Sequence, residues 1–290
     1  MQATPRQPDE LSPLAIIAGG GSVPIAVAQA VQRSGRRVVL FAVRGWADPT
    51  AVEPFAHHWL MLLQGGRFVR LARAEGCRDV VFVGTARRPP LRSLRFDWTT
   101  LRLLPRIVRA YRGGDDHLLS SLARGFEDYG FRIVGAHEVA PEILIAEGPV
   151  GKHAPSERDR ADIARALALL AATGPFDMGQ GAVVAGNHVL AVEAAEGTDA
   201  MLARIADLRA QGRIAAPPGT GVLVKAPKAQ QDRRFDLPAI GPRTVEGAAK
   251  AGLAGIAVAA GASILAQPEA VARAADKAGL FVAGIKAGTT

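Results

Sequence analysis

Short apolar runs separated by polar segments recur along most of the chain. Leu14–Ala18 and Val38–Val43 are uninterrupted apolar runs of strand length. Between them, apolar residues return at roughly helical spacing at Ile25, Ala28 and Val31. A strand, a helix and a second strand in this order predict a β-α-β unit with a parallel strand pair.

The same pattern continues through the first half of the chain. A helical segment precedes the apolar run Val80–Val83, and a further helix and strand are expected to end near Val139. Residues 14–146 therefore predict an open, Rossmann-like α/β domain. The polar residues 1–13 before it predict a disordered lead.

The second half begins after a polar segment with Pro and Gly, residues 147–160, which we interpret as a linker. Residues 161–290 then predict a second α/β (α+β) domain. Its expected helices are Asp159–Ala172, a helix with Thr198 as N-cap, Thr244–Ala251 and Pro268–Ala278, and its expected strands are Gly181–Ala185, Val189–Ala194, Val222–Lys225, Ile256–Ala259 and Leu280–Ile285.

Composition narrows the class of protein. The 290 residues suit two domains, and 49% hydrophobic residues supply sizeable cores. The net charge of +8 favours anionic partners, but no interleaved basic and aromatic residues of the kind that bind nucleic acid are present. Cys77 is the single cysteine, which excludes an internal disulfide or a cysteine zinc site and favours a core role. Because the sequence lacks a signal peptide and an apolar run of about 20 residues, we expect a soluble or peripheral protein.

The first strand leads into a glycine loop, "GGGSVP". Backbone N–H groups at such a strand-to-helix junction can face an anion, and Gly20 and Gly21 allow close approach of a ligand. Pro24 occupies the third glycine position of a dinucleotide fingerprint, and Arg44 stands near the place of its acidic residue. A ligand-binding loop and a simple tight turn are the two interpretations.

Gly84 and Thr85 follow the run Val80–Val83. Ligands of parallel sheets collect at the carboxyl ends of the strands, so these residues are expected beside Gly20 and Gly21. Arg87 and Arg88, next along the chain, either reach the same crevice or are solvated.

Further polar groups stand at element ends in the second half. Gln180 lies between two glycines at a strand entrance, which indicates a ligand contact or a bulge. Glu193, Glu196 and Asp199 surround the helix start at Thr198. These acids could hold a divalent cation or cap the helix, and capping is favoured for Asp199.

A charged stretch follows the strand that ends at Lys225, a position suited to pairing with a phosphate. Asp236 lies between apolar Phe235 and Leu237, whereas Asp232 stands in the polar run "QQDRR". Asp236 is therefore the candidate for binding a hard cation or activating a water. A solvated loop is the alternative.

The histidines fit no catalytic spacing. They are interpreted as structural or exposed residues: His57, His58, His137 and His188. Nucleophile-elbow and Walker patterns are absent from the sequence.

Several segments together resemble the LpxI-type UDP-2,3-diacylglucosamine pyrophosphatases of lipid A biosynthesis. They are "IAGGGSVP", "GAHEV", "DMGQGAVV", "LAVEAAEGTDAML", "GVLVKAPK", "DLPAIGPRT", "AGLAGIAV" and "GLFVAGI". They run in order across nearly the whole chain after the lead. "VEAAEGTDAML" and "VKAPK…D…DLPAIG" are the most specific of them.

The resemblance implies Mg²⁺-dependent hydrolysis of UDP-2,3-diacylglucosamine to UMP and 2,3-diacylglucosamine 1-phosphate (lipid X), with water attacking the sugar-side phosphorus. It implies two domains with the substrate in the cleft between them. It identifies Asp236, in the D-[LM]-P motif, as the catalytic and metal-binding residue. The implied substrate-binding residues are Gly20, Gly21, Gly84, Thr85, Gln180, Thr198 and Lys225.

The implied partners are the lipid-linked substrate and product and the anionic inner-membrane surface, with no nucleic acid. A cytoplasmic protein peripheral to that membrane is expected, and a homo-oligomer is left open. The main alternative is a nucleotide-sugar-binding module without catalysis. A nicotinamide-dependent oxidoreductase is disfavoured by Pro24 and Arg44.

Overall fold

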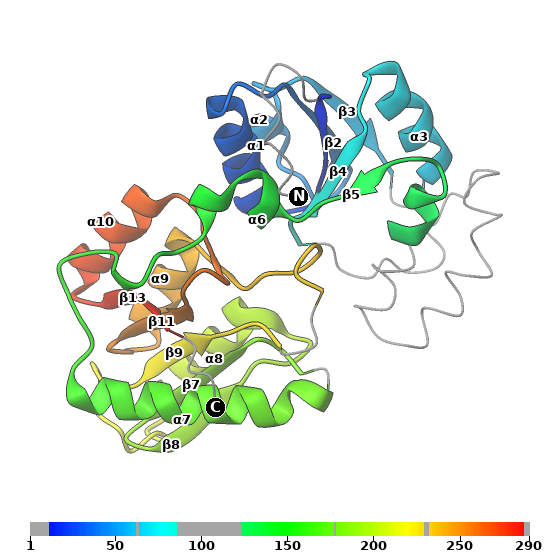
Figure 1. The fold of residues 1–290 in the computed structure, drawn as a ribbon. Coiled ribbons are helices and arrows are strands. Elements are labelled where there is room, and N and C mark those ends of the chain that lie inside the picture. Colours follow the sequence, from blue (N-terminus) through cyan, green and yellow to red (C-terminus); the bar gives the residue numbers. More distant parts are fainter. Residues whose placement is uncertain (1–11, 62–63, 86–122, 177, 229–231, 287–290) are drawn as a thin grey trace, which may run out of the picture. The chain divides into compact units, whose positions relative to one another are not determined.

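The structure is a computed structural model that describes residues 12–61, 64–85, 123–176, 178–228 and 232–286. Its contacts divide the chain into two compact units (Figure 1). Unit 1 comprises Met1–Ile143 and Asp232–Asp236, and unit 2 comprises Leu144–Gln231 and Leu237–Thr290. The predicted class, two α/β domains, is confirmed. Arg87, Arg88 and residues 1–11 of the predicted lead lie outside the described residues.

Unit 1 is built on a parallel sheet. Its strands are β1 (Leu14–Ala18), β2 (Val38–Val43), β3 (His57–Leu60), β4 (Asp79–Val83) and β5 (Arg132–Ile133), in the order β3-β2-β1-β4-β5. This is the Rossmann-like order, in which the direction of winding reverses between β1 and β4. The loops after these two strands therefore form the edge where ligands of such sheets bind.

Helices connect the strands of unit 1: α1 (Val23–Arg33), α2 (Pro49–Val52), α3 (Gly65–Ala74), α6 (Ala136–Val139) and the 3-10 helix η3 (Pro141–Ile143). One face of the sheet packs on α3 through an aromatic cluster in which Phe68 lies 4.8 Å from Phe41 and 4.9 Å from Phe126, between ring centroids. Cys77 belongs to this core, as predicted, and burial raises the pKa of its thiol to about 11.

The prediction of a strand ending near Val139 is wrong. The strand β5 ends at Ile133, and residues from Ala136 form the short helix α6. Glu138 explains the change, because its Oε1 accepts a hydrogen bond from the Gly135 backbone N–H at 2.7 Å and so caps the helix.

Unit 2 contains a mixed sheet with the order β6-β13-β11-β9-β7-β8. The central strands β9 (Val222–Lys225), β11 (Gly255–Ala259) and β13 (Phe281–Ile285) are parallel. The hairpin of β7 (Gly181–Ala185) and β8 (His188–Val192) and the short β6 (Gly148–Pro149) pair antiparallel at the two sides. β10 (Ala239–Ile240) and β12 (Ile264–Leu265) form a separate parallel pair.

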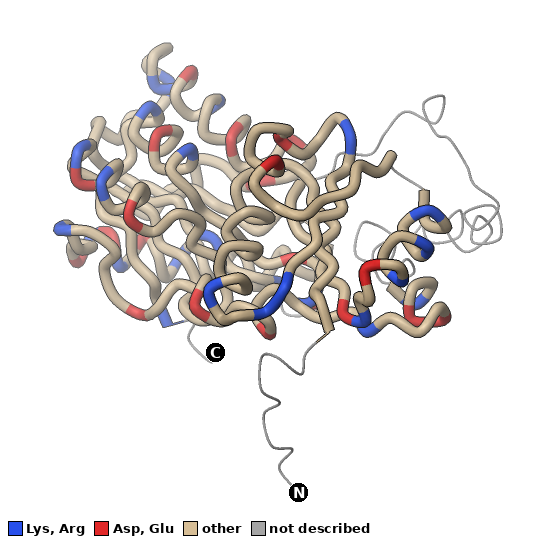
Figure 2. Tube along the Cα trace, turned by 90° about the horizontal axis from the view of Figure 1, so that it is seen from above, with Lys and Arg blue, Asp and Glu red and all other residues tan. Residues whose placement is uncertain are grey.

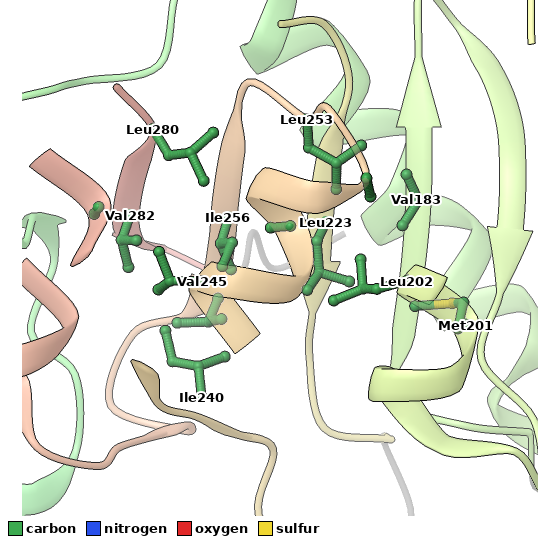
Figure 3. Close-up of a cluster of buried hydrophobic side chains, with 14 of the residues drawn as sticks. Val183, Met201, Leu202, Leu223, Ile240, Val245, Leu253, Ile256, Leu280 and Val282 are labelled. Carbon is green, nitrogen blue, oxygen red and sulfur yellow. The ribbon is translucent and has the colours of Figure 1, made fainter. Parts of the chain in front are cut away.

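Alternate residues of these strands face two cores, as strand geometry requires. Val183, Leu223 and Ile256 contact α8 (Gly197–Ala210), α9 (Pro242–Lys250) and α10 (Pro268–Ala278) in the cluster shown in Figure 3. The intervening residues, among them Val222 and Ala257, pack against α7 (Glu157–Thr173) on the other face. α7 is followed by the 3-10 helix η4 (Gly174–Phe176). Residues 147–160, predicted to be a linker, include β6 and the first turn of α7.

Candidate active site

The glycine loop of unit 1 and the loop after β4 are joined by backbone hydrogen bonds. The Gly20 N–H donates to the Thr85 carbonyl at 2.8 Å, and the Thr85 N–H donates to the Gly20 carbonyl at 2.9 Å. The prediction that these loops lie side by side is confirmed. Their contact with a ligand stays a prediction.

Packing between the loops explains most of their glycines. A Cβ on Gly19 would lie 2.7 Å from the Thr85 carbonyl oxygen. A Cβ on Gly84 would lie 2.8 Å from both the Gly20 carbonyl oxygen and Pro24 Cγ. Gly21 differs, because it has a φ of +88° and a Cβ there would meet nothing within 4 Å. Gly21 is thus the loop position that borders open space beside the start of α1.

In unit 2, three side chains form a buried cluster that we call the Lys225 cluster: Glu193, Thr198 and Lys225. Thr198 Oγ1 donates to Glu193 Oε1 at 2.8 Å and accepts from Lys225 Nζ at 2.7 Å. Glu193 Oε2 lies 3.9 Å from Lys225 Nζ, and the two side chains are 12% and 9% exposed. The charge of Lys225, which was expected from the sequence to pair with a phosphate, is therefore already balanced by the carboxylate of Glu193.

Glu193 also explains the glycines around Gln180. A Cβ on Gly179 would lie 2.6 Å from Glu193 Cγ, and one on Gly181 would lie 2.5 Å from Glu193 Oε2. The close approach that these glycines permit is made by Glu193 of the same unit. Gln180 itself is buried, and its backbone carbonyl accepts a hydrogen bond from the Ala226 N–H at 3.1 Å.

The prediction that Thr198 is the N-cap of α8 is wrong. The helix begins at Gly197 with Glu196 as N-cap, and the Thr198 hydroxyl is used by Glu193 and Lys225 instead. Asp199 lies in the first turn, as predicted, and accepts from Arg243 at 2.8 Å.

The acids near the start of α8 are paired with cations. Glu196 pairs with Arg204 at 3.2 Å, and Asp199 and Glu193 have the partners described above. Across the described residues, no group of three or more His, Cys, Asp or Glu side chains is placed to hold a metal ion. The interpretation of these acids as a preformed cation site therefore has no support here.

The segment Asp232–Asp236 packs within unit 1. Phe235 lies 5.9 Å from Phe82 between ring centroids, and Arg234 Nη1 lies 3.4 Å from Glu127 Oε1. Asp236, the candidate catalytic residue, follows Phe235 and is exposed. Anchoring by its neighbours holds its backbone to unit 1.

The other aspartate of this segment has a structural role. Asp232 accepts from the Arg234 backbone N–H at 3.0 Å and from Arg234 Nη2 at 2.8 Å. The Arg234 hydrogen bonds hold the pKa of Asp232 below its usual value, against the opposing effect of burial. His137 hydrogen-bonds with the Arg233 backbone, and burial, with the Arg233 charge, lowers its pKa. These contacts shape the loop that presents Asp236.

The predicted site residues thus fall into two sets. Gly20, Gly21, Gly84, Thr85 and Asp236 belong to unit 1, whereas Gln180, Thr198 and Lys225 belong to unit 2. Sequence reasoning missed Glu193 as the partner of Lys225, although the acid was noted among candidates for a cation. The one available signal was that Glu193 and Lys225 are residues of opposite charge at the ends of apolar runs, which does not by itself say that they meet.

Comparison with known proteins divides the chain near the same place, except that Asp232–Asp236 fall within the C-terminal match although they belong to unit 1. The LpxI N-terminal domain model matches residues 13–143, and the LpxI C-terminal domain model matches residues 146–283. A curated protein of Caulobacter vibrioides, UDP-2,3-diacylglucosamine pyrophosphatase LpxI, is 44% identical over 272 residues, which cover 94% of this chain and 97% of that protein. Both domains and nearly the full length are matched, so the chain belongs to the LpxI family.

Proposed function

We propose that this protein hydrolyses the pyrophosphate bond of UDP-2,3-diacylglucosamine, giving UMP and lipid X for lipid A biosynthesis. The observation that carries the proposal is the similarity to the Caulobacter vibrioides protein of that activity, which extends over 94% of the chain. Both units are included in this match, so the proposal draws on residues of each.

In the proposed reaction a water oxygen bonds to the sugar-side phosphorus while the bond from that phosphorus to the bridging oxygen breaks. The bridging oxygen leaves with UMP, and a proton leaves the attacking water. Asp236 is the proposed catalytic residue, because it is an exposed carboxylate on a segment fixed by Phe235 and Arg234. It either orients and deprotonates the water or holds the cation.

The residues fit a magnesium ion that arrives with the substrate. Mg²⁺ is commonly bound through one or two carboxylates together with substrate phosphates and water. An exposed carboxylate at Asp236 meets this requirement without a preformed cluster of ligands. When bound, Mg²⁺ would neutralise charge on the pyrophosphate oxygens.

The remaining residues have proposed binding roles. The Gly21 loop and Thr85 would contact the substrate in unit 1, as would Gln180, Thr198 and Lys225 in unit 2. Glu193 is a positioning residue in this proposal, since it balances and orients Lys225 through Thr198. Lys225 is an ammonium with three donors, so a phosphate oxygen can be added to the Thr198 contact.

We further propose that the protein works in the cytoplasm, at the anionic surface of the inner membrane. Among the described residues no helix is both long and apolar enough to cross a bilayer. Figure 2 shows Lys and Arg interspersed with Asp and Glu along both units. Residues 86–122 alone carry eight arginines and three aspartates. A basic segment of this kind gains about 1 kcal/mol per Lys or Arg near an anionic leaflet.

The decisive experiment is UMP release from UDP-2,3-diacylglucosamine by the purified protein. Release with Mg²⁺, its loss in EDTA and its return on adding Mg²⁺ are expected. In water enriched in ¹⁸O, the label should appear in lipid X and not in UMP. Substrate binding without UMP release would favour the non-catalytic binding module, and label in UMP would move the attack to the other phosphorus. Light scattering after gel filtration measures whether the protein is a homo-oligomer.

A further inference from the structure

A pocket with a volume of about 530 Å³ lies in unit 1, apart from the residues assigned above. It is lined by Arg44, Gly45, Trp46, Ala47, Pro49 and Trp59. Its volume is within the range of small-molecule sites, and two of its walls are aromatic. The proposed reaction gives this pocket no role so far.

The pocket is built at the carboxyl ends of two neighbouring strands. After β2 ends at Val43, the Arg44 N–H donates to the Leu60 carbonyl at 2.8 Å and the Trp46 N–H donates to the Val43 carbonyl at 3.1 Å. These bonds fix the turn that carries Arg44 and Trp46. Trp59 comes from β3, where it is paired with Ala42 of β2.

The pocket adjoins the glycine loop. A Cβ on Gly20 would lie 3.0 Å from the Trp46 carbonyl oxygen, so the turn after β2 directly borders the loop after β1. In sheets with this strand order, phosphates bind at the first strand-to-helix loop and the nucleoside extends over the end of the second strand. The pocket occupies the place of the nucleoside in that arrangement.

The chemistry of the walls suits a planar, uncharged ring with hydrogen-bond acceptors. Trp46 and Trp59 are half-buried, so each keeps part of its ring surface accessible. The guanidinium of Arg44 lies 5.4 Å from the centre of the Trp59 ring and is exposed. A pyrimidine base can stack on an indole face, while its carbonyl oxygens accept from the guanidinium.

We propose that this pocket binds the base of a uridine nucleotide, with the phosphates directed to the loop at Gly20 and Gly21. The identity of the base rests on the proposed function. The binding of a nucleotide base to Trp46, Trp59 and Arg44 can be measured without any hydrolysis.

The test compares UMP with ribose 5-phosphate, which lacks the base, by isothermal titration of the full-length protein. Trp59→Leu removes the stacking surface, and Arg44→Ala removes the guanidinium of an exposed side chain. Phe176→Leu is the control, since Phe176 is an aromatic side chain of unit 2 that is 78% exposed. Trp59→Leu should weaken UMP binding about 5- to 150-fold, the loss that corresponds to one base–aromatic stack. Arg44→Ala should weaken it at least about threefold, which corresponds to one hydrogen bond.

Ribose 5-phosphate binding should change less than twofold in Trp59→Leu, and Phe176→Leu should match the unaltered protein with both ligands. Equal loss for both ligands, or unchanged UMP binding in Trp59→Leu and Arg44→Ala, overturns the inference. The inference is also overturned if Trp59→Leu and Arg44→Ala bind phosphatidylglycerol vesicles less well than the unaltered protein but keep its affinity for UMP. That result would assign these residues to a membrane contact.

The same data separate this inference from the proposed function. If the protein hydrolyses UDP-2,3-diacylglucosamine while Trp59→Leu keeps the KM and the UMP affinity of the unaltered protein, the function stands and the base site fails. If hydrolysis is absent but UMP binding depends on Trp59 and Arg44, the base site stands and the function fails.

Discussion

Replacing Glu193 by Gln removes the negative charge that faces Lys225 and keeps the size and shape of the side chain. The Gln carbonyl can still accept from Thr198 Oγ1, as Glu193 Oε1 does at 2.8 Å. Lys225 stays buried, with its side chain 9% exposed, but its ammonium loses the carboxylate 3.9 Å away. We therefore expect unit 2 to lose stability.

The size of the loss follows from the separation of the charges. At the observed 3.9 Å, Coulomb's law with an effective dielectric constant of about 20 gives about 4 kcal/mol. Removing one partner of a buried pair typically costs about 3–5 kcal/mol, since the remaining charge is uncompensated. Glu193→Gln and Lys225→Met should each lower the free energy of unfolding by about this amount. The double variant should recover about 3 kcal/mol relative to their sum.

The assay is urea unfolding followed by two signals. The three tryptophans are Trp46, Trp59 and Trp98, so none lies in the stretches of the chain that form unit 2. Tryptophan fluorescence therefore reports unit 1, whereas far-ultraviolet circular dichroism reports both units. Recording both is necessary because a two-domain protein need not unfold in one step. The dichroism transition should shift to lower urea, and the fluorescence transition should shift less.

Glu196→Gln is the matched control, because Glu196 pairs with Arg204 at 3.2 Å and both side chains are more exposed, at 31% and 52%. An exposed pair contributes about 0–1 kcal/mol, so this variant should lose little. The reasoning is refuted if Glu193→Gln is as stable as Glu196→Gln. It is also refuted if the effects of Glu193→Gln and Lys225→Met simply add.

Three further predictions concern the site and the first unit. Asp236→Ala should lower the rate of UMP release at least about a hundredfold. Asp232→Asn keeps an acceptor for the Arg234 N–H, and its rate should stay within a few-fold of the unaltered protein. The reverse result would mean that Asp232 is the catalytic carboxylate. Gly21→Ala has a matched control in Gly130→Ala, because the two glycines have φ of +88° and +86° and open space at the Cβ position. Both variants should cost about 1–2 kcal/mol of stability, but Gly21→Ala alone should weaken substrate binding. Equal substrate binding by the two variants would mean that the glycine loop is only a turn. Asp79 is buried, which raises its pKa, but hydrogen bonds from Arg132 and Arg36 outweigh this and hold the pKa below the ordinary aspartate value of 3.8. The stabilisation by the Asp79 carboxylate is therefore present above that pH and lost as pH falls through the lowered pKa. Asp79→Asn should be less stable than the unaltered protein at pH 7, as measured by urea unfolding with tryptophan fluorescence. This difference in stability should become smaller below about pH 4. A difference independent of pH would assign the effect to shape and not to charge.

The elements were predictable from the sequence where local pattern determines them. β9 and α10 have the predicted bounds Val222–Lys225 and Pro268–Ala278, because an apolar run between turns and a helix opened by Pro are local signals. The helix within residues 134–139 was not predicted. Its formation depends on the hydrogen bond from the Gly135 N–H to the Glu138 side chain, which outweighs the apolar, strand-like character of these residues.

The site was predictable only in part, since it depends on contacts between distant residues. The placement of Gly20 beside Thr85 followed from the general arrangement of parallel sheets. The pairing of Lys225 with Glu193 did not, because periodicity carries no information on which charges meet across a fold. The same is true of Phe235, whose partner Phe82 lies far away in the sequence.

The five residues Asp232–Asp236 interleave the two units along the chain, and this constrains how members of the family can recombine. The C-terminal domain model spans residues 146–283 and so includes these residues, although their contacts are with unit 1. A chimera joined once, near residue 144, would combine Glu127 and Phe82 of one parent with Arg234 and Phe235 of the other. To keep these contacts, a chimera that exchanges the first domain between relatives should also take residues Asp232–Asp236 from the parent that supplies that domain. Asp236 would then come from the same parent as Glu127 and Phe82, which its neighbours contact.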